Sequence, residues 1–287
     1  MRLAMGLRTL LLMGPLATAG PQASPRGTDG VVATRTIVRG EEECMAHAET
    51  DTLTITVVYD NMVYEQGLGT GWGYAAVVER RGAVLLFDTG GDGATLMANL
   101  RQLGVDPRRI MAIVLSHAHG DHTGGLDSLL SLGIRPTVHV LPSFPQDLKV
   151  HAGQWTVVHD VSPGEELADG VFTTGEVVGG VPEQALVIHT GQGLVVLTGC
   201  AHPGVVTLVS RAAEQQAAGV HLVMGGYHLG STSDREVEGM IADLQQTGVQ
   251  YVAPSHCTGD RAIELFARAF GERYLRSGVG RVIRVVD

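Results

Sequence analysis

The chain has 287 residues, of which 44% are hydrophobic and 17% charged, and its formal net charge is −10. Such a composition is typical of a globular protein with a packed core, and it excludes a disordered or fibrous chain. The negative charge argues against a basic surface for nucleic acid, so we expect a small-molecule substrate and no nucleic-acid partner.

The N-terminus predicts a secretory signal peptide over residues 1–23. Two arginines, a short apolar run and a small-residue cleavage pattern follow one another there. Because the apolar run is too short to cross a bilayer, we expect export to the periplasm or the medium and no stable membrane span. Residues 24–50, rich in Pro, Gly and Thr, predict a flexible tether, and residues 51–287 predict one folded domain.

The first half of this domain predicts strands and short helices. Leu53, Ile55 and Val57 recur at every second position, which predicts a strand that ends at 60–61. An almost uninterrupted apolar run at 110–115 predicts a strand covered on both faces. The other elements expected here, in chain order, are strands at 74–79 and 83–87, a helix at 93–103 and a short helix at 126–132.

The last third of the chain has a regular pattern. Residues 134–189 predict only several short strands, whereas strands at 194–197, 221–224 and 250–253 each lead into a loop with a histidine and then a helix. The last of these helices is expected at about 261–270. Because α/β proteins place their chemistry in loops at the carboxyl ends of buried strands, we expect the functional site in these loops.

The segment Ser-His-Ala-His-Gly-Asp-His at 116–122 follows a buried strand directly. If the chain leaves the strand extended, His117 and His119 project to the same side and form half of a tetrahedral zinc site. Asp121 and His122 are adjacent and must diverge, so they face a second site nearby. This spacing predicts two neighbouring metal sites.

Further ligands are expected from the later strand-end loops. His202 and His256 are the first candidates, and His228 is either a ligand or a donor to the substrate. Cys200 and Cys257 lie next to histidines, as metal-site thiols do, although a small buried core residue is the usual fate of a lone cysteine. The remaining histidines lack this context and are expected to bind no metal: His47, His139, His151, His159, His189 and His221.

The motif at 116–122 resembles the main motif of the metallo-β-lactamase superfamily. Phe87-Asp88-Thr89-Gly90 and the order of the later loops also match. The set of motifs is similar to one branch, the metal-dependent hydrolases of β-lactamase superfamily II, which includes archaeal dihydropterin ribofuranosyl-aminobenzene phosphate synthase-like proteins. The resemblance implies an α/β fold, an αββα sandwich of two mixed β-sheets flanked by helices, with two divalent cations, zinc first and Mn²⁺ or Fe²⁺ as alternatives.

The resemblance also implies a ligand set. It assigns His117, His119 and His202 to the first metal, and it assigns Asp121, His122 and His256 to the second. One departure concerns Cys200, because most members have Gly-Asp where this chain has Gly199-Cys200. Either a thiolate bridges the metals, or His202 replaces the missing ligand, or one metal is held tightly and the other loosely.

We expect these residues to support metal-assisted hydrolysis of a phosphoester or of a carbonyl substrate such as an ester or lactone. Asp121 would orient the attacking water or take its proton, with His228 as a donor to the developing oxyanion. Asp60 is either a partner of a ligating histidine or a strand-end cap. The alternatives are a mononuclear iron thiol or persulfide oxygenase and a non-catalytic exported metal-binding protein. Methanopterin synthesis is not expected of an exported chain.

Overall fold

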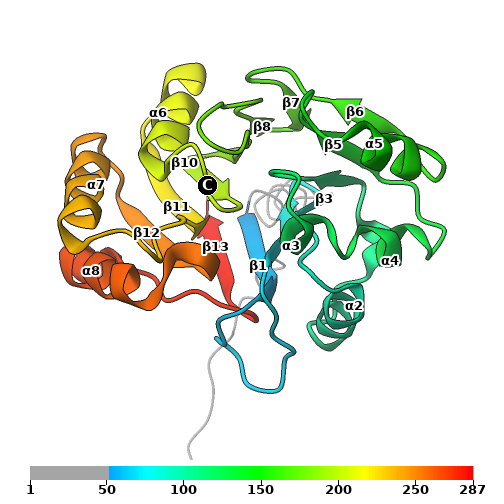
Figure 1. Cartoon of the computed structure of the whole chain (residues 1–287), viewed down its shortest axis with the longest axis horizontal. Helices are drawn as coiled ribbons and strands as arrows, with labels where there is room; N and C mark the ends of the chain where they lie inside the picture. Colours follow the sequence, from blue (N-terminus) through cyan, green and yellow to red (C-terminus); the bar gives the residue numbers. More distant parts are fainter. Residues whose placement is uncertain (1–51, 287) are drawn as a thin grey trace, which may run out of the picture. The chain divides into compact units, whose positions relative to one another are not determined.

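The computed structural model describes residues 52–286, so the expectations for residues 1–23 and 24–50, and for His47, concern residues outside this range. Two mixed β-sheets form the centre of the described chain, one of seven strands and one of six (Figure 1). The first has the order β13-β1-β2-β3-β4-β5-β6, and the second has the order β12-β11-β10-β9-β8-β7.

The strands of the first sheet are β1 (Thr52–Asp60), β2 (Tyr74–Arg80), β3 (Ala83–Phe87), β4 (Ala112–Val114), β5 (Thr137–Val140), β6 (Val158–Asp160) and β13 (Val282–Val286). Those of the second are β7 (Glu166–Ala168), β8 (Val171–Thr173), β9 (Leu186–Thr190), β10 (Gly193–Thr198), β11 (Val220–Gly226) and β12 (Tyr251–Ser255). The strands β3 to β6 run parallel, as do β10 to β12.

The helices are α2 (Gly93–Gln102), α3 (Gly120–Thr123), α4 (Leu126–Leu130), α5 (Gln146–Gly153), α6 (Val205–Gln216), α7 (Asp234–Gln246) and α8 (Asp260–Phe270). Short 3-10 helices span Pro107–Arg109, His256–Thr258 and Gly271–Arg273. The helices α2, α4 and α5 lie on the side of the first sheet, and α6, α7 and α8 lie on the side of the second (Figure 1).

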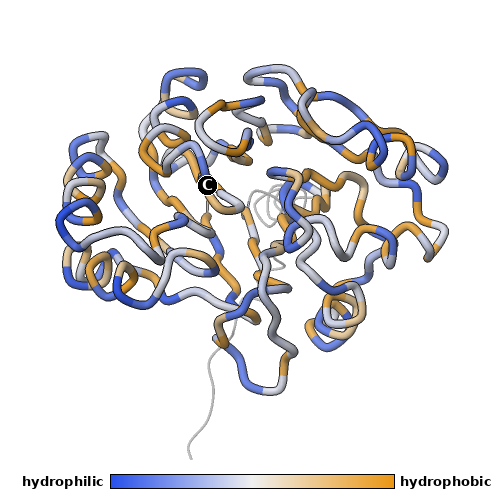
Figure 2. The backbone as a smooth tube through the Cα atoms, viewed as in Figure 1, coloured by the Kyte–Doolittle hydropathy of each residue, from blue (hydrophilic) through white to orange (hydrophobic). Residues whose placement is uncertain are grey.

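Three hydrophobic layers hold this arrangement together. The middle layer lies between the sheets, where Leu53, Ile55 and Val57 of β1 meet side chains such as Leu197 and Met224 of the second sheet. The other two lie between each sheet and its helices. Figure 2 shows hydrophobic segments along the strands and hydrophilic segments on the outer turns of the helices. The αββα sandwich expected from the sequence is therefore confirmed.

The helices are formed by local signals that the sequence carries. In α6, the buried residues Val205, Leu208, Val209 and Ala212 recur with helical spacing and face the second sheet. Burying one such leucine or valine contributes about 1.5–3 kcal/mol. At the start of α7, Ser233 and Glu236 form a capping box that satisfies two backbone N–H groups.

Two elements were not expected from the sequence. The helix α5 lies within 134–189, where only short strands were predicted; it buries only Ala152, so its apolar pattern is weak. The strand β13 pairs antiparallel with β1, and it buries Ile283 and Val285 while Arg284 and Val286 face outward. Three or four residues of alternation are too few to predict a strand without its partner.

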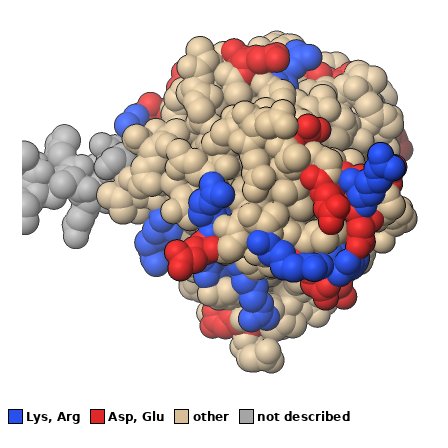
Figure 3. Space-filling model, turned by 90° about the vertical axis from the view of Figure 1, so that its left-hand side faces the viewer, with Lys and Arg blue, Asp and Glu red and all other residues tan. Residues whose placement is uncertain are grey.

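The surface over α7 and α8 carries charges of both signs. Figure 3 shows acidic and basic side chains interspersed on this face. Here the Nε of Arg261 lies 3.0 Å from Oδ1 of Asp234, and its Nη1 lies 3.0 Å from Oε2 of Glu264. Because these pairs are exposed to solvent and screened by salt, they contribute little to the stability of the fold. Over the described residues, none of the helices has the length and apolarity needed to span a membrane.

Candidate metal centre

The expected site residues lie at one edge of the sandwich, in the loops after β4, β10, β11 and β12. Backbone strain gathers at the same edge. Among the described residues, six non-glycine residues have a positive φ. Four of these follow strands here, namely Asp88, Ala201, His228 and His256, with φ between 52° and 59°. Strain of this kind persists where the surrounding structure fixes a side chain for function.

The first group of side chains is His117, His119 and His202, called the outer set below. Each offers one ligand atom, and these atoms all lie within 4.8 Å of one another. Nε2 of His117 lies 3.1 Å from Nδ1 of His119. Nε2 of His202 is buried without a hydrogen-bond partner, which is costly for a polar atom unless a ligand occupies the space. These three nitrogens fit a cation.

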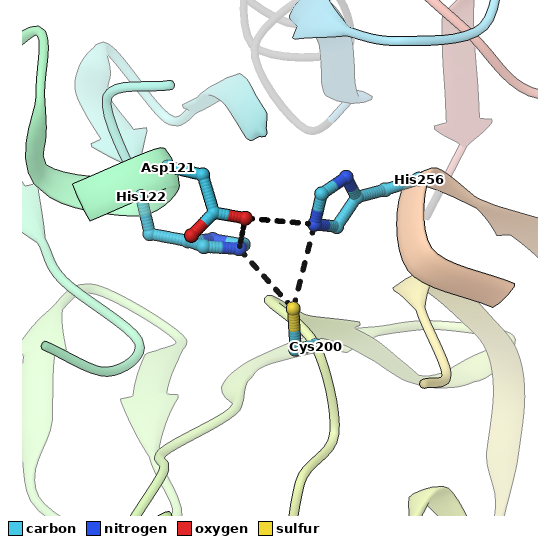
Figure 4. Close-up of side chains that lie close together, drawn as sticks. All are labelled: Asp121, His122, Cys200 and His256. Atoms are coloured by element: carbon cyan, nitrogen blue, oxygen red, sulfur yellow. Dashed lines mark hydrogen bonds and ion pairs between the residues drawn. The ribbon is translucent and has the colours of Figure 1, made fainter. Parts of the chain in front are cut away.

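The second group is Asp121, His122, Cys200 and His256, called the inner set below. Figure 4 shows the four side chains converging from α3, from the loop after β10 and from the 3-10 helix after β12. Oδ2 of Asp121 lies 3.5 Å from Nε2 of His122 and 3.4 Å from Nε2 of His256. Sγ of Cys200 lies 3.3 Å and 3.4 Å from the same two nitrogens.

These separations match a tetrahedral site. Zinc holds nitrogen and oxygen ligands at about 2.0–2.2 Å and thiolate sulfur at about 2.3 Å, so neighbouring ligand atoms stand about 3.3–3.6 Å apart. The four separations in the inner set given above lie between 3.3 and 3.5 Å. The donor set of two imidazoles, one carboxylate and one thiol suits zinc better than magnesium or calcium.

The buried Asp88 orients histidines of both sets. Nδ1 of His122 donates to Oδ2 of Asp88 at 2.7 Å, which leaves Nε2 free toward the inner set. The hydroxyl of Ser116 also donates to Oδ2 at 2.7 Å, and Nδ1 of His117 lies 2.9 Å from that hydroxyl oxygen. A partner on the second ring nitrogen fixes the tautomer and orientation of a ligating histidine.

Asn61 orients His256 in the same way. Nδ1 of His256 donates to Oδ1 of Asn61 at 2.8 Å, and Nδ2 of Asn61 donates to the carbonyl of His256 at 3.3 Å. Asp60, which was one candidate partner of a ligating histidine, accepts from the backbone N–H of Met62 at 2.9 Å, and His256 acts on the same carboxyl group through its charge and its backbone N–H. Burial raises the pKa of Asp60 to about 6.

Glu183 holds the loop that follows β10. This carboxyl group is fully buried, and its Oε1 accepts from the backbone N–H groups of Gly199, Cys200 and Ala201 at 2.8–3.0 Å. Its Oε2 accepts from the N–H of His202 at 2.8 Å. Burial raises the pKa of Glu183 to about 7, and the N–H groups oppose that rise. One side chain therefore positions a residue of each set.

The electrostatics of the two sets differ. Burial opposes the charge on His122, but the carboxylate of Asp88 and a hydrogen bond to Asp121 raise its pKa to about 10. Burial also disfavours the charge on Asp121, yet hydrogen bonds to His122 and His256 hold its pKa well below the usual range. In the outer set, burial and then His228 and His119 lower the pKa of His202 to about 4. The inner set thus contains an attractive pair, the carboxylate of Asp121 with the imidazole of His122, whereas burial and neighbouring histidines keep His202 of the outer set neutral.

His228 lies at the open side of the site. Its ring centroid is 4.3 Å from that of His202, and with Cys200 and His202 it forms a third group of ligand atoms within 4.8 Å of one another. A hydrogen bond with Cys257 raises the pKa of His228, and that of Cys257 is lowered by hydrogen bonds to Cys200 and His228. A protonated, exposed imidazole at this place can donate to an anionic substrate.

The structure brings together every site residue named from the sequence, and it keeps the other described histidines apart from them. Those others have partners elsewhere: His151 contacts Asp127, His159 contacts Glu165, His189 contacts Gln216, His221 contacts Gln250, and the ring of His139 lies near that of His159. The orienting residues Asn61, Ser116 and Glu183 were missed. Only Asp88 carried a sequence signal, the Asp-Thr-Gly after β3.

Comparison with known proteins shows which family model the chain matches. The model of the family described as the Metallo-beta-lactamase superfamily matches residues 69–234, more than half of the chain. A relative from Methanocaldococcus jannaschii, named 7,8-dihydropterin-6-methyl-4-(beta-D-ribofuranosyl)-aminobenzene-5'-phosphate synthase, is 27% identical over 70% of this chain and 84% of its own.

Solved structures give a matching result. Tm1679, described as a metal-dependent hydrolase of the beta-lactamase superfamily, is 27% identical, with a TM-score of 0.70 over 82% of this chain and 100% of that one. A diphosphatase from the PhnP family is 18% identical, with a TM-score of 0.57 over 82% of this chain and 97% of that one, and it shows the fold alone.

Proposed function

The chain belongs to the metallo-beta-lactamase superfamily, and we propose that it is a metal-dependent hydrolase that holds two divalent cations and cleaves a phosphoester, ester or lactone. One observation carries this proposal. Seven ligand side chains from three separate stretches of the chain converge in two neighbouring sets. A mononuclear iron oxygenase needs only one such set, so the second set favours the hydrolase.

The inner set would hold one cation through Asp121, His122, Cys200 and His256, and the outer set would hold the other through His117, His119 and His202. When bound, such cations lower the pKa of a coordinated water toward neutrality and polarise the bond to be cleaved. No group containing Cys200 includes His117 or His119, so we assign the thiol to the inner cation.

The side chains around the sets have separate roles in this proposal. Because its pKa is held low, Asp121 is ionised at neutral pH, and we assign it to binding the cation and orienting the attacking water by accepting a hydrogen bond. His228 is assigned to donating a hydrogen bond to the oxygen that gains negative charge. The raised pKa of His228 supports that role, because it favours the protonated ring.

A bond-forming reaction at the same site is the second candidate, since the M. jannaschii relative is named as a synthase. The name of that protein includes a 5'-phosphate, so we place phosphorylated compounds first among the substrates to be tested. Turnover of a phosphoester with water as the only co-substrate would favour the hydrolase over the synthase.

We also propose that the chain is exported and that residues 1–23 are removed. The charge, apolar run and small-residue pattern of this segment support the proposal. Intact mass of the protein recovered from separated cell fractions tests it. A full-length protein confined to the cytoplasm would contradict it.

Elemental analysis joined to a substrate screen tests the proposed activity. We expect about two equivalents of zinc, manganese or iron per chain, and turnover of at least one phosphodiester, phosphomonoester or lactone. The change Asp121→Asn should lower kcat by about 10²–10⁴-fold, because the amide is a weaker ligand and acceptor. Asp127→Asn is the matched control, since Asp127 is exposed and pairs with His151. A folded protein without metal would refute the proposal.

A further inference from the structure

A large aromatic side chain stands exposed beside the inner set. Trp72 lies in the segment between β1 and β2, and 61% of its surface is accessible to solvent. Its ring centroid lies 4.9 Å from that of His256, at an interplanar angle of 54°. His256 itself is 2% exposed. The indole therefore touches the rim of the metal centre with one part and presents most of its surface to solvent.

The backbone that carries this indole is fixed against the metal centre. A Cβ at Gly73 would lie 2.2 Å from the carbonyl oxygen of Asp121, and one at Gly91 would lie 2.7 Å from that of Trp72. The N–H of Gly71 donates to the carbonyl of Asp60 at 3.2 Å. Only glycine permits these approaches, so the segment packs directly on the backbone of an inner-set residue.

Exposing an indole on a rigid backbone leaves a large apolar surface in water. A side chain needed only to cover His256 would gain stability by burying more of its own apolar surface. Ligand sites commonly combine an aromatic wall with a few fixed polar groups. Because the indole contacts the ring of His256, which belongs to the inner set, a small molecule lying on the free part of the indole would lie beside that set.

From this geometry we propose that Trp72 is the stacking platform for the substrate, and that the substrate is an ester or phosphoester that carries a flat aromatic or heterocyclic group. This inference rests on the proposed function, because it places the flat group next to a cleaved bond at the metal centre. Aromatic rings stack on tryptophan in offset or tilted arrangements, so the platform selects by shape rather than by charge.

Two phosphonates that differ only in their organic group test the platform, because both carry the same charged phosphonate group and neither is hydrolysed. Calorimetric titration of the metal-loaded full chain compares phenylphosphonate with methylphosphonate. We expect tighter binding of the phenyl compound, and we expect Trp72→Ala to weaken it about five- to tenfold while changing methylphosphonate binding less than about twofold. Trp72→Phe should restore most of the loss. The control is Trp155→Ala, which removes the other exposed tryptophan, after α5.

Metal content measured on each variant separates the possible outcomes. Equal weakening of both phosphonates, together with lost metal, would show that Trp72 only covers His256 and would overturn the platform. A metal-loaded wild type with no preference for phenylphosphonate would overturn it as well and would leave the proposed function standing. A wild type without metal would overturn the proposed function itself.

Discussion

The inner and outer sets share two loops of the chain but differ in how firmly they are held. The segment at 116–122 supplies two residues to each set, and the loop after β10 supplies Cys200 to the inner set and His202 to the outer. In the inner set, His122 and His256 are buried, and each has a fixed partner at 2.7–2.8 Å. In the outer set, His119 is exposed and His202 is half-buried.

This difference indicates a division of labour. Ligands that are buried and oriented in advance lose little freedom when a cation binds, so the inner set should bind its cation more tightly. The outer set is open to solvent beside His228, where a substrate can reach it. Of the three arrangements left open by the sequence, one tight and one loose metal is the arrangement we favour. Four predictions test this difference between the two sets.

The largest effect is expected from Glu183→Ala, because it removes the acceptor of four backbone N–H groups in the loop shared by both sets. Leaving those groups buried and unpaired should cost on the order of 4 kcal/mol. Urea unfolding and metal content should show lower stability and loss of both cations. Glu183→Gln, which keeps an acceptor oxygen, should lose less. Full retention of both cations in the alanine variant would show that Glu183 is not needed to position the loop shared by the two sets.

Cys200→Ser should weaken the inner cation by about 10–100-fold and leave the outer one in place, because we assign the thiol to the inner set, where it lies 3.3–3.4 Å from Nε2 of His122 and of His256. Cobalt substitution gives the readout, since a thiolate bound to Co²⁺ produces a charge-transfer band in the near ultraviolet. The band should vanish in Cys200→Ser and persist in Cys257→Ser, the control at the neighbouring thiol. A band lost only in the Cys257 variant would reassign the ligand.

Asn61→Ala should lower the affinity of the inner cation by about tenfold, because His256 loses the partner that orients its ring. Competition with a chelator measures this affinity. Asn61→Asp keeps an oxygen acceptor at the same place and should retain most of it. An unchanged affinity of the inner cation in Asn61→Ala would contradict the role of Asn61, and loss of the inner cation before the outer one from the wild type would contradict the predicted order of the two sets.

The smallest effect concerns the pH dependence of the metal-free protein. The pKa of His202 is about 4 in the folded protein and about 6.5 in the unfolded chain. As pH falls from about 6.5 toward about 4, the unfolded chain binds a proton at His202 more readily than the folded protein does, so the folded protein loses stability. After allowance for solvent screening we expect a loss below about 1 kcal/mol between about pH 7 and about pH 5. Urea unfolding of wild type and His202→Gln measures it, and equal losses would contradict the assignment.

The clustering of the candidate ligands was predictable, whereas most of the residues that position them were not. Adjacent residues after a strand have directions fixed by covalent geometry, so the spacing of His117, His119, Asp121 and His122 is legible in the sequence. The partner of His256 lies 195 residues away at Asn61, and that of His122 lies 34 residues away at Asp88. Because the two partners in each contact are so far apart in the chain, neither contact can be predicted from neighbouring residues.

Local patterns were enough to predict the order of most strands and helices and the residues that meet at one edge, because hydrophobic period and strand-end position are local properties of the chain. The αββα class followed from the resemblance of the motifs to a known family. Tertiary structure alone decided that β13 completes the first sheet beside β1, that Cys200 joins the inner set, that Glu183 braces both sets and that Trp72 stands beside His256. These contacts join distant segments, and only packing in three dimensions selects their partners.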